Sequence, residues 1–150
     1  MVKLYNEVKE IITLAEYSNP KQAYIISSAN ELRATLDHIM KTFNEETEDV
    51  KEFDRAKGHL YRAGFDAYEV IATEKLKSIK TIKEQYLYDS IIQAYPDYHK
   101  VLIPLIHKAQ KRLAIARSSK VITDNRSEEQ NFREYEAIVT DLEKGAESLE

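Results

Sequence analysis

The chain has 150 residues, of which 32% are charged and 43% hydrophobic, and its formal net charge at pH 7 is −4. That length predicts a single domain over residues 1–150, built around one core. The absence of cysteine excludes disulfides, thiolate zinc sites and cysteine nucleophiles. No apolar run approaches the roughly 18 residues of a membrane span, and no signal-peptide core begins the sequence. We therefore expect a cytoplasmic protein without a membrane partner.

Hydrophobic residues recur at helical spacing along almost the whole sequence, which contains only three glycines and three prolines. A first helix is predicted within residues 2–17. A second is predicted from about Pro20 to Phe43, because Asn19 suits the N-cap and Pro20 suits the first helical position. The residues expected to be buried in these two helices are Tyr5, Val8, Ile11, Ile12, Ala15, Ile25, Ala29, Leu32, Leu36, Ile39 and Phe43.

A third helix is predicted after the acidic run at residues 44–49, with Thr47 as its cap. Its apolar side is rich in small residues, which lets a partner helix approach closely; it comprises Phe53, Ala56, Leu60, Ala63, Gly64, Ala67 and Ile71. No glycine or proline marks its end before Pro96, and one helix reaching Ala94 would exceed about 65 Å. We therefore predict a break near residues 78–84 and a shorter helix over residues 86–95.

The last third of the sequence predicts two more helices. Asp97 is expected to cap the first of them and Pro104 to bend it, because proline removes a hydrogen bond to the preceding turn. Ser127 and Gln130 form a capping box that begins the second. Its expected apolar face is Phe132, Tyr135, Ile138, Val139, Leu142 and Leu149. The predicted fold class is all-α, an antiparallel bundle of five to six helices.

The charge is distributed unevenly over this region. Residues 98–120 include six basic side chains and no acidic one, whereas residues 121–150 include nine acidic and three basic ones. In one interpretation the two segments are neighbouring helices that attract each other. In the other, the basic helix faces an anionic ligand.

Two polar stripes contain the candidate site residues. On the third helix, spacings of three and four residues place Arg55, His59, Arg62, Asp66, Glu69 and Thr73 on one side. On the second helix Asn30, Arg33 and Asp37 fall together, and His38 lies between that polar face and the core. These stripes can be ordinary solvated helix faces. The alternative is a site, which their composition supports, because arginine presents a planar fork suited to phosphate and histidine titrates near neutral pH.

Other chemistry is poorly represented. The sequence has no glycine-rich phosphate loop and no HExxH-like metal spacing, so we expect neither a cofactor nor a metal. Four of the ten tyrosines, Tyr86, Tyr88, Tyr95 and Tyr98, gather around Pro96. Such rings serve packing or a dimer contact in one interpretation and base stacking in the other.

The stretch Arg33-Ala-Thr-Leu-Asp-His38 has the spacing of the arginine, four to six residues, histidine motif of HEPN domains, and Arg55-Ala-Lys-Gly-His59 falls one residue short of it. Over about residues 20–73, the phrases NELRATLDHI and GHLYRAGFDAYE also resemble those of bacterial HEPN-like helical proteins. HEPN domains are small α-bundles that commonly dimerise. Many are metal-independent ribonucleases of toxin–antitoxin and antiviral defence systems, and others serve as non-catalytic binding or assembly modules.

The resemblance implies that Arg33 is the phosphate-binding cation and His38 its catalytic partner. His59 and Arg62 join them as catalytic candidates if the second and third helices pack with these faces together. Asn30, Asp37, Arg55 and Asp66 are the candidate binding residues. The expected partners are RNA or a nucleotide, a second copy of the chain, or another protein. Whether the chain is an enzyme is left open, the alternative being a non-catalytic interaction or dimerisation module.

Overall fold

The structure is a computed structural model that describes residues 1–19, 25–43, 49–121 and 128–147. These ranges form helices and no strand. In chain order the elements are α1 (Val2–Ser18), α2 (Ile25–Lys41), α3 (Asp49–Gln85), α4 (Tyr88–Ala94), a π-helical turn (Tyr98–Leu102), α5 (Ile103–Val121) and α6 (Glu128–Glu147). The all-α prediction is therefore confirmed for the described residues. Within the same ranges, no helix has the combined length and apolar character needed to cross a bilayer.

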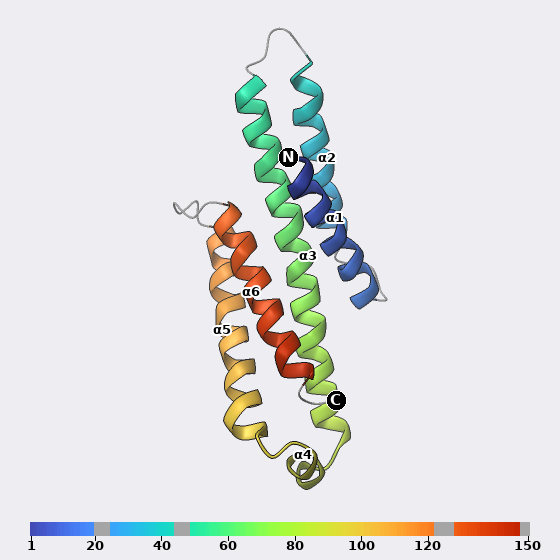
Figure 1. Cartoon of the computed structure of the whole chain (residues 1–150), viewed down its shortest axis with the longest axis vertical. Coiled ribbons are helices and arrows are strands. Elements are labelled where there is room, and N and C mark those ends of the chain that lie inside the picture. Colours follow the sequence, from blue (N-terminus) through green and yellow to red (C-terminus); the bar gives the residue numbers. More distant parts are fainter. Residues whose placement is uncertain (20–24, 44–48, 122–127, 148–150) are drawn as a thin grey trace.

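Helix α3 is the axis of the molecule. Figure 1 shows it running from one end to the other, with α1 and α2 beside its first part and α5 and α6 beside its later part. The main core forms where α1, α3, α5 and α6 meet, and its fully buried large side chains include Leu60, Leu113, Phe132, Tyr135 and Ile138. A second, smaller core of Ile79, Ile91, Tyr98 and Leu102 lies toward α4.

The predicted break in α3 near residues 78–84 is wrong. The helix continues for 37 residues to Gln85, which corresponds to about 55 Å. Residues 75–85 contain no glycine or proline and are mostly good helix formers. Ile79 is buried in the second core, so packing also supports the helix at this point. The chain turns only after residue 85, and the short α4 follows within the range predicted for it.

The predicted buried face of α2 is also wrong in part. Ala29, Leu36 and Phe43 are exposed, whereas Ser28 and Thr35 are buried. The expectation assumed that the most apolar side of the helix would face the core. Instead α2 lies against the small-residue side of α3 through short polar side chains, which leaves Leu36 and Met40 exposed, whereas Leu32 is half-buried against the main core. Tyr5 of α1 and Phe53 of α3 were likewise expected in the core and are exposed.

The region after Pro96 differs from the prediction in its backbone. We expected Asp97 to begin an α-helix that Pro104 bends, and the structure has a π-helical turn directly before α5. The Ile103 N–H donates to the Tyr98 carbonyl, five residues earlier. A wider turn is a natural neighbour of Pro104, which has no N–H to continue the α-helical ladder.

Helices α5 and α6 confirm that the basic and acidic segments attract each other. Arg112 donates to Glu134 at 2.8 Å and to Asp141 at 2.7 Å, and Lys108 lies 3.7 Å from the same Asp141 carboxylate. The buried face of α6 includes five of its six predicted apolar residues. The sixth, Leu149, lies outside the described residues, as do the predicted caps Thr47 and Ser127 and the helix start at Pro20.

Candidate functional site

The candidate site lies between α2 and α3, which approach closely through small side chains. The buried Ser28 hydroxyl on α2 donates to the Ala63 carbonyl of α3 at 3.0 Å. Seven residues further along α2, the buried Thr35 hydroxyl donates to the Glu31 carbonyl at 2.9 Å and lies 3.5 Å from the Ala56 carbonyl. The two backbones are therefore close enough for side chains of one helix to bond those of the other.

Two histidine–glutamate pairs cross this interface. His38 of α2 bonds through Nδ1 to Glu52 of α3 at 2.6 Å, and Arg55 donates to the other oxygen of the same carboxylate at 2.6 Å. In the second pair the histidine comes from α3 and the glutamate from α2. His59 of α3 bonds through Nδ1 to Glu31 of α2 at 2.7 Å.

Arg62 completes the second pair. Its Nε donates to Glu31 at 2.9 Å, and its terminal nitrogen donates to Glu128 at the start of α6 at 3.1 Å. Each carboxylate, Glu31 and Glu52, thus receives one imidazole and one guanidinium. A guanidinium has five N–H donors, so Arg55 and Arg62 retain donors for an anion while they hold these bonds.

The two imidazole rings stack on each other. The centroids of His38 and His59 are 5.0 Å apart and their planes differ by 24°. The side chains are 16% and 21% exposed. In the tautomer in which Nδ1 donates to the carboxylate, Nε2 has no proton and can accept one. The cluster therefore places two oriented imidazoles and two guanidinium groups within one small region.

The structure brings together four of the eight predicted site residues, namely His38, Arg55, His59 and Arg62. Asn30, Arg33 and Asp37 are exposed on α2, and the cluster's hydrogen bonds do not involve them. Asp66 accepts a hydrogen bond from Ser27 at 2.6 Å, further along α3. Arg33 and His38 are thus five residues apart on α2 and about 140° apart around its axis, because each residue turns the helix by about 100°.

Sequence reasoning missed the two glutamates that orient the imidazoles. The signal was present, because the α3 stripe extends one step back at the same spacing, from Arg55 to Glu52. On α2 the contact face is Ser28, Glu31, Thr35 and His38, which also follow one another at three- and four-residue intervals. Short polar residues at that spacing mark a face that packs closely, and this face is the one opposite α3.

The far end of the predicted α3 stripe belongs to another network. The Glu69 carboxylate accepts from Arg117 of α5 at 2.6 Å and from the Tyr135 hydroxyl of α6 at 3.1 Å. Arg117 also donates to Thr73 at 3.2 Å. Burial raises the pKa of Tyr135, and the negative charge of Glu69 adds to that shift. This network joins α3, α5 and α6 and lies apart from the histidine pair.

The tyrosines around Pro96 take different positions. Tyr98 is buried in the second core, and Tyr95 packs against that core. Tyr88 is exposed, and its hydroxyl meets the His99 ring. Tyr86 is exposed. Packing therefore accounts for Tyr95 and Tyr98. Among the described residues, no group of three or more potential metal ligands was found.

The pKa of Glu52 gives the cluster an acid-sensitive contribution to stability. The hydrogen bond from His38 lowers this pKa below 4.5, burial opposes the shift, and Arg55 lowers it further. Between the lowered folded pKa and the ordinary value, the unfolded chain binds more protons. The contribution is thus fully present above about pH 4.5 and is lost as the pH falls through the folded pKa.

We expect Glu52→Gln to lower the urea midpoint at pH 6 and to lower it progressively less as the pH falls below about 4.5. Urea titrations at half-unit pH steps would measure this difference. Glu16→Gln, a change at an exposed carboxylate of α1, is the matched control and should leave the difference from the unmodified protein small at every pH. A Glu52→Gln effect of constant size from pH 3 to pH 7 would contradict the assignment.

Comparisons of this chain with protein-family models, with curated proteins and with solved structures gave no match.

Proposed function

We propose that this chain is a HEPN-like helical protein that binds RNA between α2 and α3 and cleaves it without a metal ion. The observation that supports this most is the stacked pair of His38 and His59, each held through Nδ1 by its own glutamate. A lone surface histidine has no such orienting partner. The two rings come from different helices, so the pair exists only in the folded protein.

The chemistry requires a base, an acid and a cation. One imidazole, neutral, takes the proton from the ribose 2′-hydroxyl as the 2′-oxygen forms a bond to phosphorus. The other, protonated, gives its proton to the 5′-oxygen as the bond from phosphorus to that oxygen breaks. The products are a 2′,3′-cyclic phosphate and a 5′-hydroxyl, so atoms and charge balance. Arg55 and Arg62 flank the imidazoles and can bind the phosphate oxygens as negative charge builds up.

We propose a role for Arg33 that differs from the one the resemblance implies. The resemblance implies that it binds the phosphate beside His38, but Arg33 is exposed on another side of α2. We therefore assign the phosphate-binding role to Arg55 and Arg62. Arg33, Asn30 and Asp37 then form an exposed surface along which a longer RNA strand can extend.

We expect His38→Gln and His59→Gln each to reduce cleavage of a single-stranded RNA by about 100-fold or more, the range in which general acid–base groups contribute. The assay is run with excess EDTA on purified protein, and the matched control is His107→Gln, at an exposed histidine of α5. Circular dichroism and thermal unfolding establish that the variants fold. A DNA of the same sequence should remain intact, because it has no 2′-hydroxyl.

The variant Arg33→Ala distinguishes between the two assignments of the phosphate-binding side chain, which are Arg33 on the one hand and Arg55 with Arg62 on the other. It should change cleavage by less than about threefold if Arg55 and Arg62 bind the phosphate, and abolish it if the resemblance assigns the role correctly. Full cleavage by both folded histidine variants would eliminate the site.

A second candidate is a non-catalytic interaction module, and one observation favours it. Large apolar side chains are exposed where α2 ends and α3 begins, at the end of the pair remote from α4 (Figure 1). They are Leu36, Met40, Phe43, Val50 and Phe53, and they are between 45% and 78% exposed. This candidate predicts no cleavage of RNA by any variant, together with self-association or capture of a protein partner at this end.

A further inference from the structure

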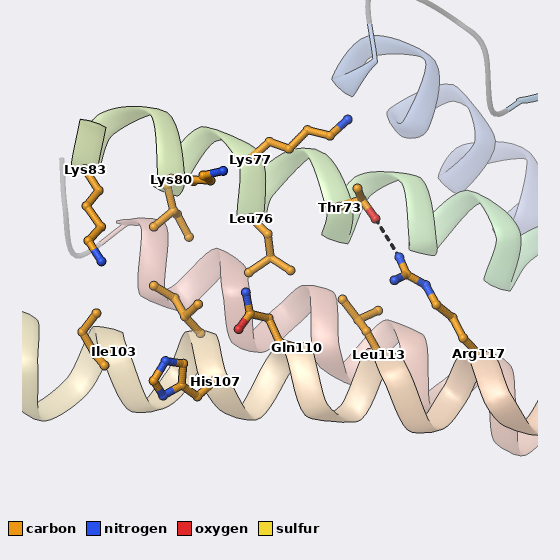
Figure 2. Close-up of a pocket in the computed structure, with 12 residues that line it drawn as sticks. Thr73, Leu76, Lys77, Lys80, Lys83, Ile103, His107, Gln110, Leu113 and Arg117 are labelled. Carbon is orange, nitrogen blue, oxygen red and sulfur yellow. Dashed lines mark hydrogen bonds between the residues drawn. The ribbon is translucent and has the colours of Figure 1, made fainter. Parts of the chain in front are cut away.

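A groove runs between α3 and α5 because both helices pack against α6 and hardly against each other. Figure 2 shows α3 along one side, α5 along the other and α6 behind them. The groove has a volume of about 530 Å³, which is within the ordinary range for small-molecule sites. It lies on the part of α3 beyond residue 72 and is separate from the histidine cluster.

The floor of the groove is aliphatic. Leu76 and Ile79 come from α3, and Ile103, Ile106 and Leu113 come from α5. Ile79 and Leu113 are buried, and the other three are half-buried at the surface of the cores. Among the described residues that line the groove, none is phenylalanine, tyrosine or tryptophan. An aliphatic floor favours a hydrocarbon ligand over nucleic acid bases, which bind preferentially on aromatic rings.

The rim is basic. Lys77, Lys80, Lys83 and Arg117 line the groove together with His107, and none of its twelve lining residues, all in the described part of the chain, is acidic. Figure 2 shows Lys83 pointing across the gap toward α5, whereas Lys77 points away from it. Cations over an aliphatic floor complement a ligand that has one negative charge and an apolar body.

Besides Arg117, which bonds to Glu69 at 2.6 Å, two of these cations have acidic neighbours, both on α3 itself. Lys77 bonds to Glu74 at 2.6 Å and is 56% exposed, and Lys80 lies 3.6 Å from Glu84 and is 75% exposed. Exposed pairs of this kind are weak, and lysine stems are long and mobile. The ammonium groups of Lys80 and Lys83 can therefore turn to a bound anion at little cost.

The two ends of the groove differ. At one end Arg117 reaches from α5 to Thr73 of α3, with a hydrogen bond of 3.2 Å that closes the gap (Figure 2). At the other end Lys80 and Lys83 stand near the opening toward α4. Thr73 and Lys83 are ten positions apart on α3, which corresponds to about 15 Å along the helix. The groove is therefore an elongated slot with a closed end and a cationic entrance.

We propose that this groove binds a free single-chain acyl anion, such as a fatty carboxylate. The carboxylate lies at Lys80 and Lys83, and the hydrocarbon chain extends over Ile79, Ile106 and Leu76 toward the closed end at Arg117. Each methylene that leaves water contributes to binding, and the two lysines select the anionic head over a neutral one. This site is independent of the proposed RNA cleavage and does not share its residues.

Isothermal titration calorimetry with laurate, below the concentration at which it forms micelles, tests the proposal. We expect saturable binding of one laurate per chain. The double variant Lys80→Gln/Lys83→Gln should weaken it by about 2- to 25-fold, since each exposed charge pair contributes a factor of roughly 1.5 to 5. The matched control is Lys3→Gln/Lys9→Gln, which removes two exposed lysines of α1 and should bind laurate like the unmodified protein.

A blocking variant tests the slot itself. Gln110 is exposed, lines the groove and points toward Leu76 (Figure 2), so Gln110→Trp should fill the channel and abolish laurate binding without removing a core side chain. Thermal unfolding of each variant shows whether the fold is kept. Equal affinity for the neutral lauramide, laurate binding unchanged in the lysine variant, or lysine-dependent binding of only RNA or anionic vesicles would overturn the proposal.

Discussion

Gly64→Ala is expected to lower the free energy of unfolding by about 1–2 kcal/mol. A methyl group at this position would lie 2.3 Å and 2.8 Å from two ring carbons of Phe132, and 3.1 Å from a methyl carbon of Val8. Carbon atoms do not approach so closely, so the α3–α6 contact must shift. Overpacking of a well-filled core typically costs about 1–3 kcal/mol and occasionally more. The better helix propensity of alanine returns only about 1 kcal/mol of this.

Gly58→Ala is the matched control on the same helix. A methyl there would meet its nearest neighbours, in Glu128 and Arg62, at 3.5 Å and 3.6 Å, which are ordinary contact distances. We expect this variant to be about 0.5–1 kcal/mol more stable than the unmodified protein. Thermal and urea unfolding would measure both changes, and for a chain of this size each kcal/mol moves the midpoint by about 2–4 °C. Equal stability of the two variants would contradict the close contact at Gly64.

Phe132→Ala is expected to cost about 3–5 kcal/mol, the range for removing a buried phenylalanine side chain. The Phe132 ring is fully buried between Tyr61 and Tyr68, whose ring centroids lie 5.6 Å and 5.4 Å from its own. Both tyrosines belong to α3, so this ring is one of the side chains by which α6 packs on that helix. Urea unfolding followed by circular dichroism would measure the loss.

The double variant Gly64→Ala/Phe132→Ala tests whether the two effects share one contact. The methyl at residue 64 then enters space that the ring has left. The sum of the two single effects gives the stability expected without coupling. We expect the double variant to exceed that stability by about 1 kcal/mol or more. Strict additivity would show that the cost at Gly64 arises elsewhere, for example at Val8.

The helical periodicity of the sequence predicted most of the fold, because burial on α1, α3 and α6 follows the most apolar side of each helix. It failed for α2, where Ser28 and Thr35 are buried while Leu36 and Met40 are exposed. A helix that packs on a glycine- and alanine-rich face gains from close approach, and short hydroxyl side chains permit that approach. The balance between these effects depends on the partner helix and cannot be read from one helix alone.

The site was predicted to a similar extent. The histidines and arginines stood out as unusual residues on their helices, and the structure places His38, His59, Arg55 and Arg62 together. Glu31 and Glu52 did not stand out, because glutamate is a common surface residue. Their roles depend on the register between α2 and α3, which is a property of the packed pair. The groove between α3 and α5 could not be predicted from the sequence either, since it depends on how α3 and α5 pack against α6.

The 37 residues of α3 also determine the hydrodynamic shape of the protein. A helix of about 55 Å with its neighbours distributed along it makes a rod-like particle. A compact globule of 150 residues has a radius of gyration near 15 Å, and this chain should scatter with a larger value. Elongated particles elute early in gel filtration, so a monomer of this protein will have the elution volume of a heavier globule. Its state of association therefore has to be determined by light scattering, which reports mass independently of shape.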